Sequence, residues 1–267
     1  MKPVALLLMA LLLASQGAQA FQNYKAIAIT FALKSSAQVF EVYRPYLSQI
    51  AFWASEPDQW GDCWNHVYYE DGSGHLPEVV EYYFYKACEH LRMNELEDSA
   101  KYLAYALSYL LDACNPFNTC SEADGSLARA YRRFLNDNIE GILSRVDSSS
   151  LRVVVRAPRE IVEDLARLSR RLYPRLENAF RKGDYKEVYE VALELIRMGL
   201  EGCLSLLSQL PLSAFERVLN TPVLKEIFYA SLVVTAISAA YLARQRALRE
   251  EEVEVSPEEA PVPPPEQ

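Results

Sequence analysis

The sequence has few of the residues and motifs on which common enzyme classes depend. Its 267 residues include three histidines, His66, His75 and His90. It has no Cys-x-x-Cys pair of the kind that binds zinc. It also has neither a glycine-rich phosphate loop nor the Gly-x-Ser-x-Gly turn of serine hydrolases. The sequence therefore has none of the usual signatures of a zinc finger, a nucleotide-binding enzyme or a serine hydrolase.

Glycine and positive charge are also scarce. Nine glycines stand against 17 tyrosines, which together with long runs of Ala, Leu, Glu and Arg indicates a helical protein. The formal net charge is -9, and we expect no nucleic-acid partner, because binding a phosphate backbone requires a basic face. Apolar residues make up 51% of the chain and charged residues 24%, as in a globular protein with a substantial core.

The N-terminus predicts export. Residues 1–20, MKPVALLLMALLLASQGAQA, combine an early lysine, a leucine-rich stretch and an Ala-Gln-Ala ending. This is the pattern of a secretory signal peptide with a small-x-small cleavage site, so the mature chain is expected to begin at Phe21.

Export makes disulfide bonds possible for the cysteines. There are five of them, so at least one lies outside any intrachain pair. Cys114 and Cys120 bracket an Asn-Pro turn and are a possible disulfide, although spacing does not determine the connectivity. Cys88 and Cys203 lie within helical patterns and fit equally well as small buried residues.

The periodicity of apolar residues predicts an all-α domain over residues 21–219. The expected helices cover residues 23–34, 38–53, 77–92, 96–112, 127–146, 159–172, 174–182 and 185–207. Residues 54–75, rich in Pro, Gly, Asp and aromatics, are expected to form a long ordered loop, which in a compact domain is usually functional. The valine-rich segment 152–155 fits either a short strand or a linker.

The C-terminal region predicts a membrane anchor. Residues 227–243 carry no charge and, at about 1.5 Å per residue, span roughly 25 Å of a bilayer core about 30 Å thick. Arg244, Arg246 and Arg249 follow, and positive charge favours the cytoplasmic side. We therefore expect a transmembrane helix with a basic flank at 220–249, the domain outside the cell membrane and an acidic, proline-rich, disordered tail at 250–267 inside. The alternative is a buried C-terminal helix in a secreted protein.

Three residues are candidate metal ligands. Asp58 and His66 lie in the long loop, and Asp112 lies on the apolar face of the helix that ends in SYLLDACNPFNT, residues 108–119. Histidine nitrogen and carboxylate oxygen are the ligands of zinc in hydrolases. Each residue also has a simpler interpretation: Asp58 as a turn cap, His66 as a hydrogen-bonded core histidine, and Asp112 as a partner of Ser108, Tyr109 or the turn backbone.

The same residues resemble a known family. Pro57-Asp58, His66 shortly before a Tyr-Tyr pair, and ALSYLLDACNPFNT are similar to the zinc-dependent phospholipase C family, which includes the single-strand-specific nucleases of fungi and plants. The resemblance covers about residues 21–210. It implies an exported protein with a mostly helical fold. Members of the family bind three zinc ions and use them to hydrolyse phosphodiesters.

The chain departs from the family pattern at most ligand positions. Only Asp58, His66 and Asp112 match it. Where the family has an N-terminal Trp and His, two His around the central Asp, and a downstream His and Glu, this chain has Phe21, Ala26, Ser108, Asn118, Tyr131 and Leu135. Because only His66 of the three histidines falls on the pattern, the chain cannot assemble the three-zinc cluster.

Two functions follow from these departures. The first is a membrane-anchored, non-catalytic binding or structural protein, with hydrogen bonds through Ser108 and Asn118 in place of metals and no cofactor. The alternative is a reduced metal-dependent phosphodiesterase, of phospholipase C or nuclease type, with a single zinc ion on Asp58, His66 and Asp112 activating water. Whether the ligand is a protein or a phosphate ester stays open.

Overall fold

The computed structural model describes residues 23–212 and four single residues further on, Val233, Thr235, Ile237 and Ala240. All the regular structure of these residues is helical, which confirms the all-α prediction. The predicted signal peptide, Phe21 and the acidic tail lie outside the described residues. So does most of the predicted anchor, of which only the four single residues are described, as helical and exposed.

The helices follow one another along the chain, and the longest connection between them is residues 54–75. They are α2 (Tyr24–Ser35), α3 (Ala37–Tyr43), α4 (Leu47–Trp53), α5 (Leu76–Arg92), α6 (Leu96–Ala113), α7 (Pro116–Thr119), α8 (Gly125–Ser144), α9 (Pro158–Lys182) and α10 (Tyr185–Leu207). Short 3-10 turns are η1 (Arg44–Tyr46), η2 (Pro57–Gln59), η3 (Cys63–His66) and η4 (Ser148–Ser150). None of the helices among the described residues has the length and apolar character needed to cross a membrane.

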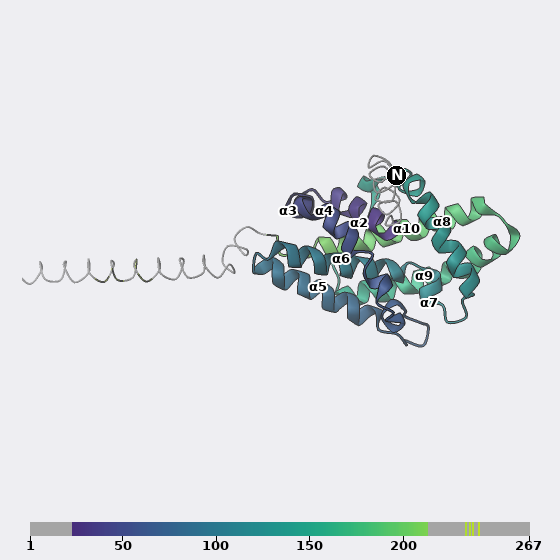
Figure 1. The fold of residues 1–267 in the computed structure, drawn as a ribbon, viewed down its shortest axis with the longest axis horizontal. Coiled ribbons are helices and arrows are strands. Elements are labelled where there is room, and N and C mark those ends of the chain that lie inside the picture. Colours follow the sequence, from purple (N-terminus) through teal and green to yellow (C-terminus); the bar gives the residue numbers. More distant parts are fainter. Residues whose placement is uncertain (1–22, 213–232, 234, 236, 238–239, 241–267) are drawn as a thin grey trace, which may run out of the picture. The chain divides into compact units, whose positions relative to one another are not determined.

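Helix α6 is the centre of the domain. It packs along α5 and also contacts α2, α4, α9 and α10 (Figure 1). Glu97 and Asp98 in its first turn complement the positive end of the helix dipole. Every residue from Leu103 to Ala113 is buried, as expected of a helix covered on all sides. Asp112 is one of these residues, so its carboxylate must find partners inside the protein.

Helices α9 and α10 form an antiparallel pair. Gly183 ends α9 in the left-handed conformation (φ 68°), and Asp184 then caps α10 by accepting a hydrogen bond from the Glu187 N–H. Gly202 lets α10 approach its neighbours, because a Cβ atom there would lie 2.6 Å from Leu165 Cδ1 of α9. The pair is therefore close-packed where the glycine faces α9.

Two local predictions are corrected by the structure, and one open alternative is decided. The expected helix 38–53 is interrupted by η1, which contains Pro45. The expected helices 159–172 and 174–182 are one helix, α9, because buried Tyr173 and Leu176 hold it against the core on both sides of Pro174. Segment 152–155 is a linker rather than a strand, since Val154 N–H donates to Ser205 Oγ of α10 instead of to another strand.

All five cysteines, which lie within residues 23–212, are free thiols. The predicted pair is not joined, because its two side chains face different neighbours. Cys114 is buried beside Gly199 of α10, whereas Cys120 is half-buried and hydrogen-bonded to Glu70.

The central position of α6 predicts a large cost for removing its core side chains. Leu107→Ala should lower the free energy of unfolding by about 2–5 kcal/mol, because Leu107 is fully buried and its loss leaves a cavity. Leu168→Ala in α9 is the matched control, since this side chain is 40% exposed and should cost much less. Urea denaturation measures both; equal losses would contradict the central role of α6.

Candidate functional site

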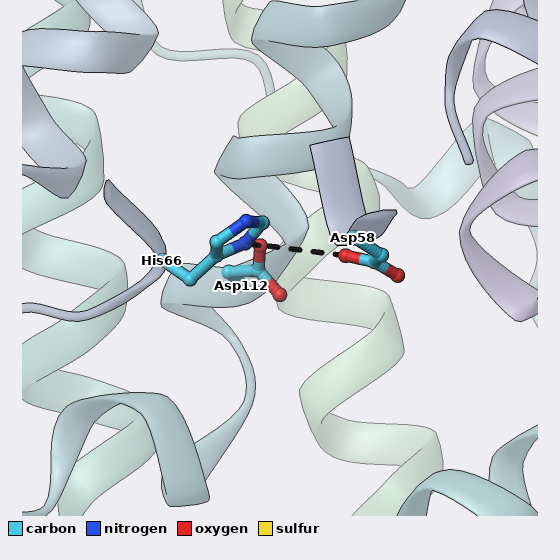
Figure 2. A group of neighbouring side chains, drawn as sticks. All are labelled: Asp58, His66 and Asp112. Atoms are coloured by element: carbon cyan, nitrogen blue, oxygen red, sulfur yellow. Dashed lines mark hydrogen bonds and ion pairs between the residues drawn. The ribbon is translucent and has the colours of Figure 1, made fainter. Parts of the chain in front are cut away.

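The structure brings the three candidate ligands together from three elements. Asp58 lies on η2, His66 ends η3, and Asp112 lies near the end of α6. Figure 2 shows the three side chains facing one another, and one ligand atom of each lies within 4.8 Å of the others. The long loop therefore does position polar side chains over α6, although their role as metal ligands stays a prediction.

A lysine that sequence analysis did not identify lies between the two carboxylates. Lys25 Nζ, from the first turn of α2, is 2.7 Å from Asp58 Oδ1. It is also 2.8 Å from Asp112 Oδ1 and 2.9 Å from Asp112 Oδ2. The Lys25 side chain is 2% exposed, so its ammonium group is a buried cation held by two anions.

The N-terminus of α2 directs Lys25 into the cluster. Asn23 caps the helix, with its Oδ1 accepting a hydrogen bond from the Lys25 N–H at 3.1 Å. The Nδ2 of the same asparagine donates to Asp58 Oδ2 at 3.0 Å. One side chain thus starts the helix and aligns it with η2.

His66 is hydrogen-bonded on both sides of its ring. Nδ1 lies 2.8 Å from Asp112 Oδ2, and Nε2 lies 3.2 Å from both Asp62 Oδ1 and the Pro57 carbonyl oxygen. All these partners accept hydrogen bonds, which favours the doubly protonated imidazolium. Burial lowers the pKa of His66, but the hydrogen bond and charge of Asp112 outweigh it and hold the pKa above its usual 6.5.

Asp62 is the second residue that sequence analysis missed. Its Oδ2 accepts hydrogen bonds from Tyr109 Oη and Asn65 Nδ2, each at 2.8 Å. Its Oδ1 faces His66. Asp62 therefore joins the outer side of His66 to Tyr109 of α6.

The charges of the cluster stabilise one another. Burial lowers the pKa of Lys25, but the carboxylates of Asp112 and Asp58 raise it to a net value above the usual 10.5. Burial raises the pKa of Asp58, but the Lys25 ammonium holds it below the usual 3.8. The site is thus a network of ion pairs in which each charge has a buried or half-buried partner.

The described positions that depart from the family pattern take three different roles. Asn118 joins the cluster, because its Nδ2 donates to Asp112 Oδ1 at 2.9 Å as the hydrogen-bond hypothesis requires. Ser108 does not join it and instead donates to the Ala54 carbonyl oxygen at 2.8 Å. Ala26, Tyr131 and Leu135 are buried in the hydrophobic core.

With Lys25 in this position, the donor set does not fit a metal ion. A divalent cation on these residues would need free lone pairs on Asp58, His66 and Asp112. The ammonium already occupies the space between the two carboxylates, and the Nδ1 of His66 faces Asp112. Two cations sharing the site would repel each other strongly at low dielectric. The three residues could hold one zinc ion only if Lys25 moved away.

One sequence signal could have identified Lys25. It is the single charged residue in the stretch FQNYKAIAITFAL, residues 21–33. Lysines are usually solvated, and one isolated among apolar residues needs a buried partner or an exposed position. Periodicity alone does not show that it faces Asp58 and Asp112.

Comparisons with protein-family models and with curated proteins find no match. The resemblance to the zinc-dependent phospholipase C family therefore stays a prediction made from the residues, and the geometry of the cluster carries the functional argument.

The buried ion pairs predict a large effect of replacing the lysine. Lys25→Met should lower the free energy of unfolding by about 3–5 kcal/mol, because it leaves the buried Asp112 and its neighbour Asp58 without their cation. The double variant Lys25→Met with Asp112→Asn should recover a large part of this loss, since it also removes the unpaired buried charge. Urea denaturation tests both; a single variant as stable as the wild type would contradict the geometry.

The lowered pKa of Asp58 predicts how its contribution changes with pH. Its ion pair with Lys25 stabilises the fold fully above the usual pKa of 3.8, and this stabilisation is lost as the pH falls through the lowered value. The difference in free energy of unfolding between the wild type and Asp58→Asn should be constant above the usual pKa of 3.8 and should shrink as the pH falls through the lowered pKa of the folded state. A difference that does not change with pH would show that Asp58 is unpaired.

Proposed function

We propose that this chain is a non-catalytic binding or structural protein, exported and held in the cell membrane by its C-terminal helix, with a phospholipase C-like domain outside. The observation that carries the proposal is the position of Lys25 Nζ between Asp58 and Asp112. Export and anchoring rest on the signal-like residues 1–20 and the uncharged stretch 227–243.

The cluster lacks what metal-dependent hydrolysis requires. In such enzymes a metal ion lowers the pKa of a bound water and polarises the phosphoryl oxygen, and it needs a coordination position open to both. An ammonium group cannot bind a water as a ligand. Its pKa is raised, so Lys25 is not available as a neutral base either. Lys25 thus supplies the positive charge of a metal without its chemistry.

The arrangement is suited to a structural role. Lys25, Asp58, His66 and Asp112 come from α2, η2, η3 and α6, so the ion pairs connect α2 and the long loop to the central helix α6. Asp58, Asp62 and His66 also line a surface cleft of about 300 Å³. The network therefore supports one wall of a cleft that a ligand can enter.

A single-metal phosphodiesterase is the alternative. The observation that favours it is the distance of 4.8 Å or less between the ligand atoms of Asp58, His66 and Asp112. Under this alternative Lys25 would withdraw, and His66 would be a neutral imidazole that has lost the proton on the nitrogen facing the metal and keeps the proton on the other nitrogen.

Metal content separates the two functions. The full mature chain, purified in detergent and dialysed against trace zinc, should retain no stoichiometric metal by elemental mass spectrometry. The Lys25→Ala variant should retain about one zinc per chain, because Asp58, His66 and Asp112 are then free to bind it. Adding His66→Ala to that variant should remove the zinc again.

The opposite result would overturn the proposal. A wild-type chain that holds zinc, loses it on His66→Ala and hydrolyses a chromogenic phosphodiester is the single-metal enzyme. His75→Ala is the control for loss of a histidine elsewhere, since His75 is exposed and belongs to neither group of side chains placed to share a metal ion.

A further inference from the structure

Helix α8 carries three arginines on one face. Arg129, Arg132 and Arg133 are spaced by three and four residues and therefore lie on adjacent turns of the same side. All three are exposed, whereas Tyr131 and Leu135 on the other side of α8 are buried. The hydrophobic core thus determines which face of α8 points outward, and that face is basic.

The three arginines line a cleft of about 390 Å³. Asn115, Asn118, Asn136 and Asp137 complete the polar part of its wall. Asn115 is 7% exposed, and Asn136 is fixed because its Oδ1 accepts a hydrogen bond from the Tyr24 N–H at 3.0 Å. The cleft adjoins the one beside the Lys25 cluster, since Asn118 and Arg132 line both.

These arginines differ from most others in having no ion-pair partner. Seven arginines elsewhere in the described part of the chain form ion pairs with Asp or Glu: Arg145, Arg156, Arg159, Arg167, Arg175, Arg181 and Arg197. Within residues 23–212, Arg129, Arg132 and Arg133 form none. Like charges at this spacing repel and destabilise a helix. An anion bound between them would remove this repulsion.

The chemistry of the lining indicates the charge and shape of that anion. Guanidinium groups are planar forks that bind phosphate or carboxylate oxygens in pairs, and asparagine amides add neutral donors. Three guanidiniums and the single carboxylate of Asp137 give the lining a net charge of +2. A doubly charged oxyanion with several acceptor oxygens matches this charge, and a phosphate monoester has both properties.

We propose that the arginine cleft of α8 binds a phosphate monoester group, either on a soluble ligand or on a lipid headgroup. The inference rests on the proposed function only in that the phosphate is held beside the Lys25 cluster and is not hydrolysed there. Arg129 and Arg133 bind the phosphate oxygens, and Arg132 lies between this cleft and the carboxylates of Asp58 and Asp62.

The test measures binding of phosphate to the full chain in nanodiscs of neutral phosphatidylcholine. Inorganic phosphate is titrated by calorimetry, and vesicles of phosphatidylcholine with or without phosphatidic acid are tested by co-sedimentation. Saturable phosphate binding is expected, and Arg129→Gln with Arg133→Gln should weaken it at least about tenfold, because each removes charge-assisted hydrogen bonds. Arg167→Gln with Arg171→Gln, two exposed arginines of α9, is the control for the same loss of charge.

The two sources of phosphate give different results. Binding to both inorganic phosphate and phosphatidic acid vesicles indicates a site open to a lipid headgroup, and binding to inorganic phosphate alone indicates a soluble ligand. Arg129→Lys with Arg133→Lys keeps the charge but loses the paired geometry and should bind more weakly than wild type. If the glutamine variant does not fold, weaker phosphate binding by this lysine variant tests the site in its place.

Two outcomes would overturn the inference. One is no saturable binding to the wild type, and the other is an equal loss in the α9 control, which would show unspecific attraction. Neither outcome affects the non-catalytic proposal, which depends on metal content. Conversely, a chain that binds zinc and also binds phosphate through Arg129 and Arg133 would refute the non-catalytic proposal and leave this inference intact.

Discussion

The buried ammonium of Lys25 is the interaction on which the rest of the site depends. Asp112 lies on the fully buried part of α6, where an unpaired carboxylate would be strongly unfavourable. Lys25 compensates this charge and at the same time reaches Asp58 on the long loop. Helix α2, the loop and the central helix α6 are therefore joined at one atom, and the geometry of His66 and Asn118 follows from their bonds to the same carboxylate.

The same interaction has opposite consequences for structure and for chemistry. As a cation, Lys25 allows the carboxylates of Asp58 and Asp112 to lie close together inside the domain, as a metal ion would. As an ammonium group it provides no open coordination position, so it cannot activate water. The ion pairs therefore maintain the charge balance of the site, and the arginine cleft adjoins it through Asn118 and Arg132.

Local patterns predicted the helices well where burial and periodicity agree. Helices α2, α5, α6 and α10 lie within a residue or two of the expected ranges, because their apolar residues recur at helical spacing and polar residues mark their ends. The errors occurred at prolines. Pro45 lies in a break between α3 and α4, whereas Pro174 does not end α9, since the side chains around it are packed against the core. Proline restricts the backbone locally, but packing decided whether the helix continued.

The sequence predicted the all-α class and indicated Asp58, His66 and Asp112 as candidate metal ligands. It did so because helical periodicity and residue chemistry are local properties that can be read along the chain. What lies between those three side chains depends on tertiary packing. Lys25 is 33 residues from Asp58 and 87 from Asp112, and a contact across such distances depends on how α2 packs against α6. The identity of the cation at the site is therefore a property of packing, which no local pattern contains.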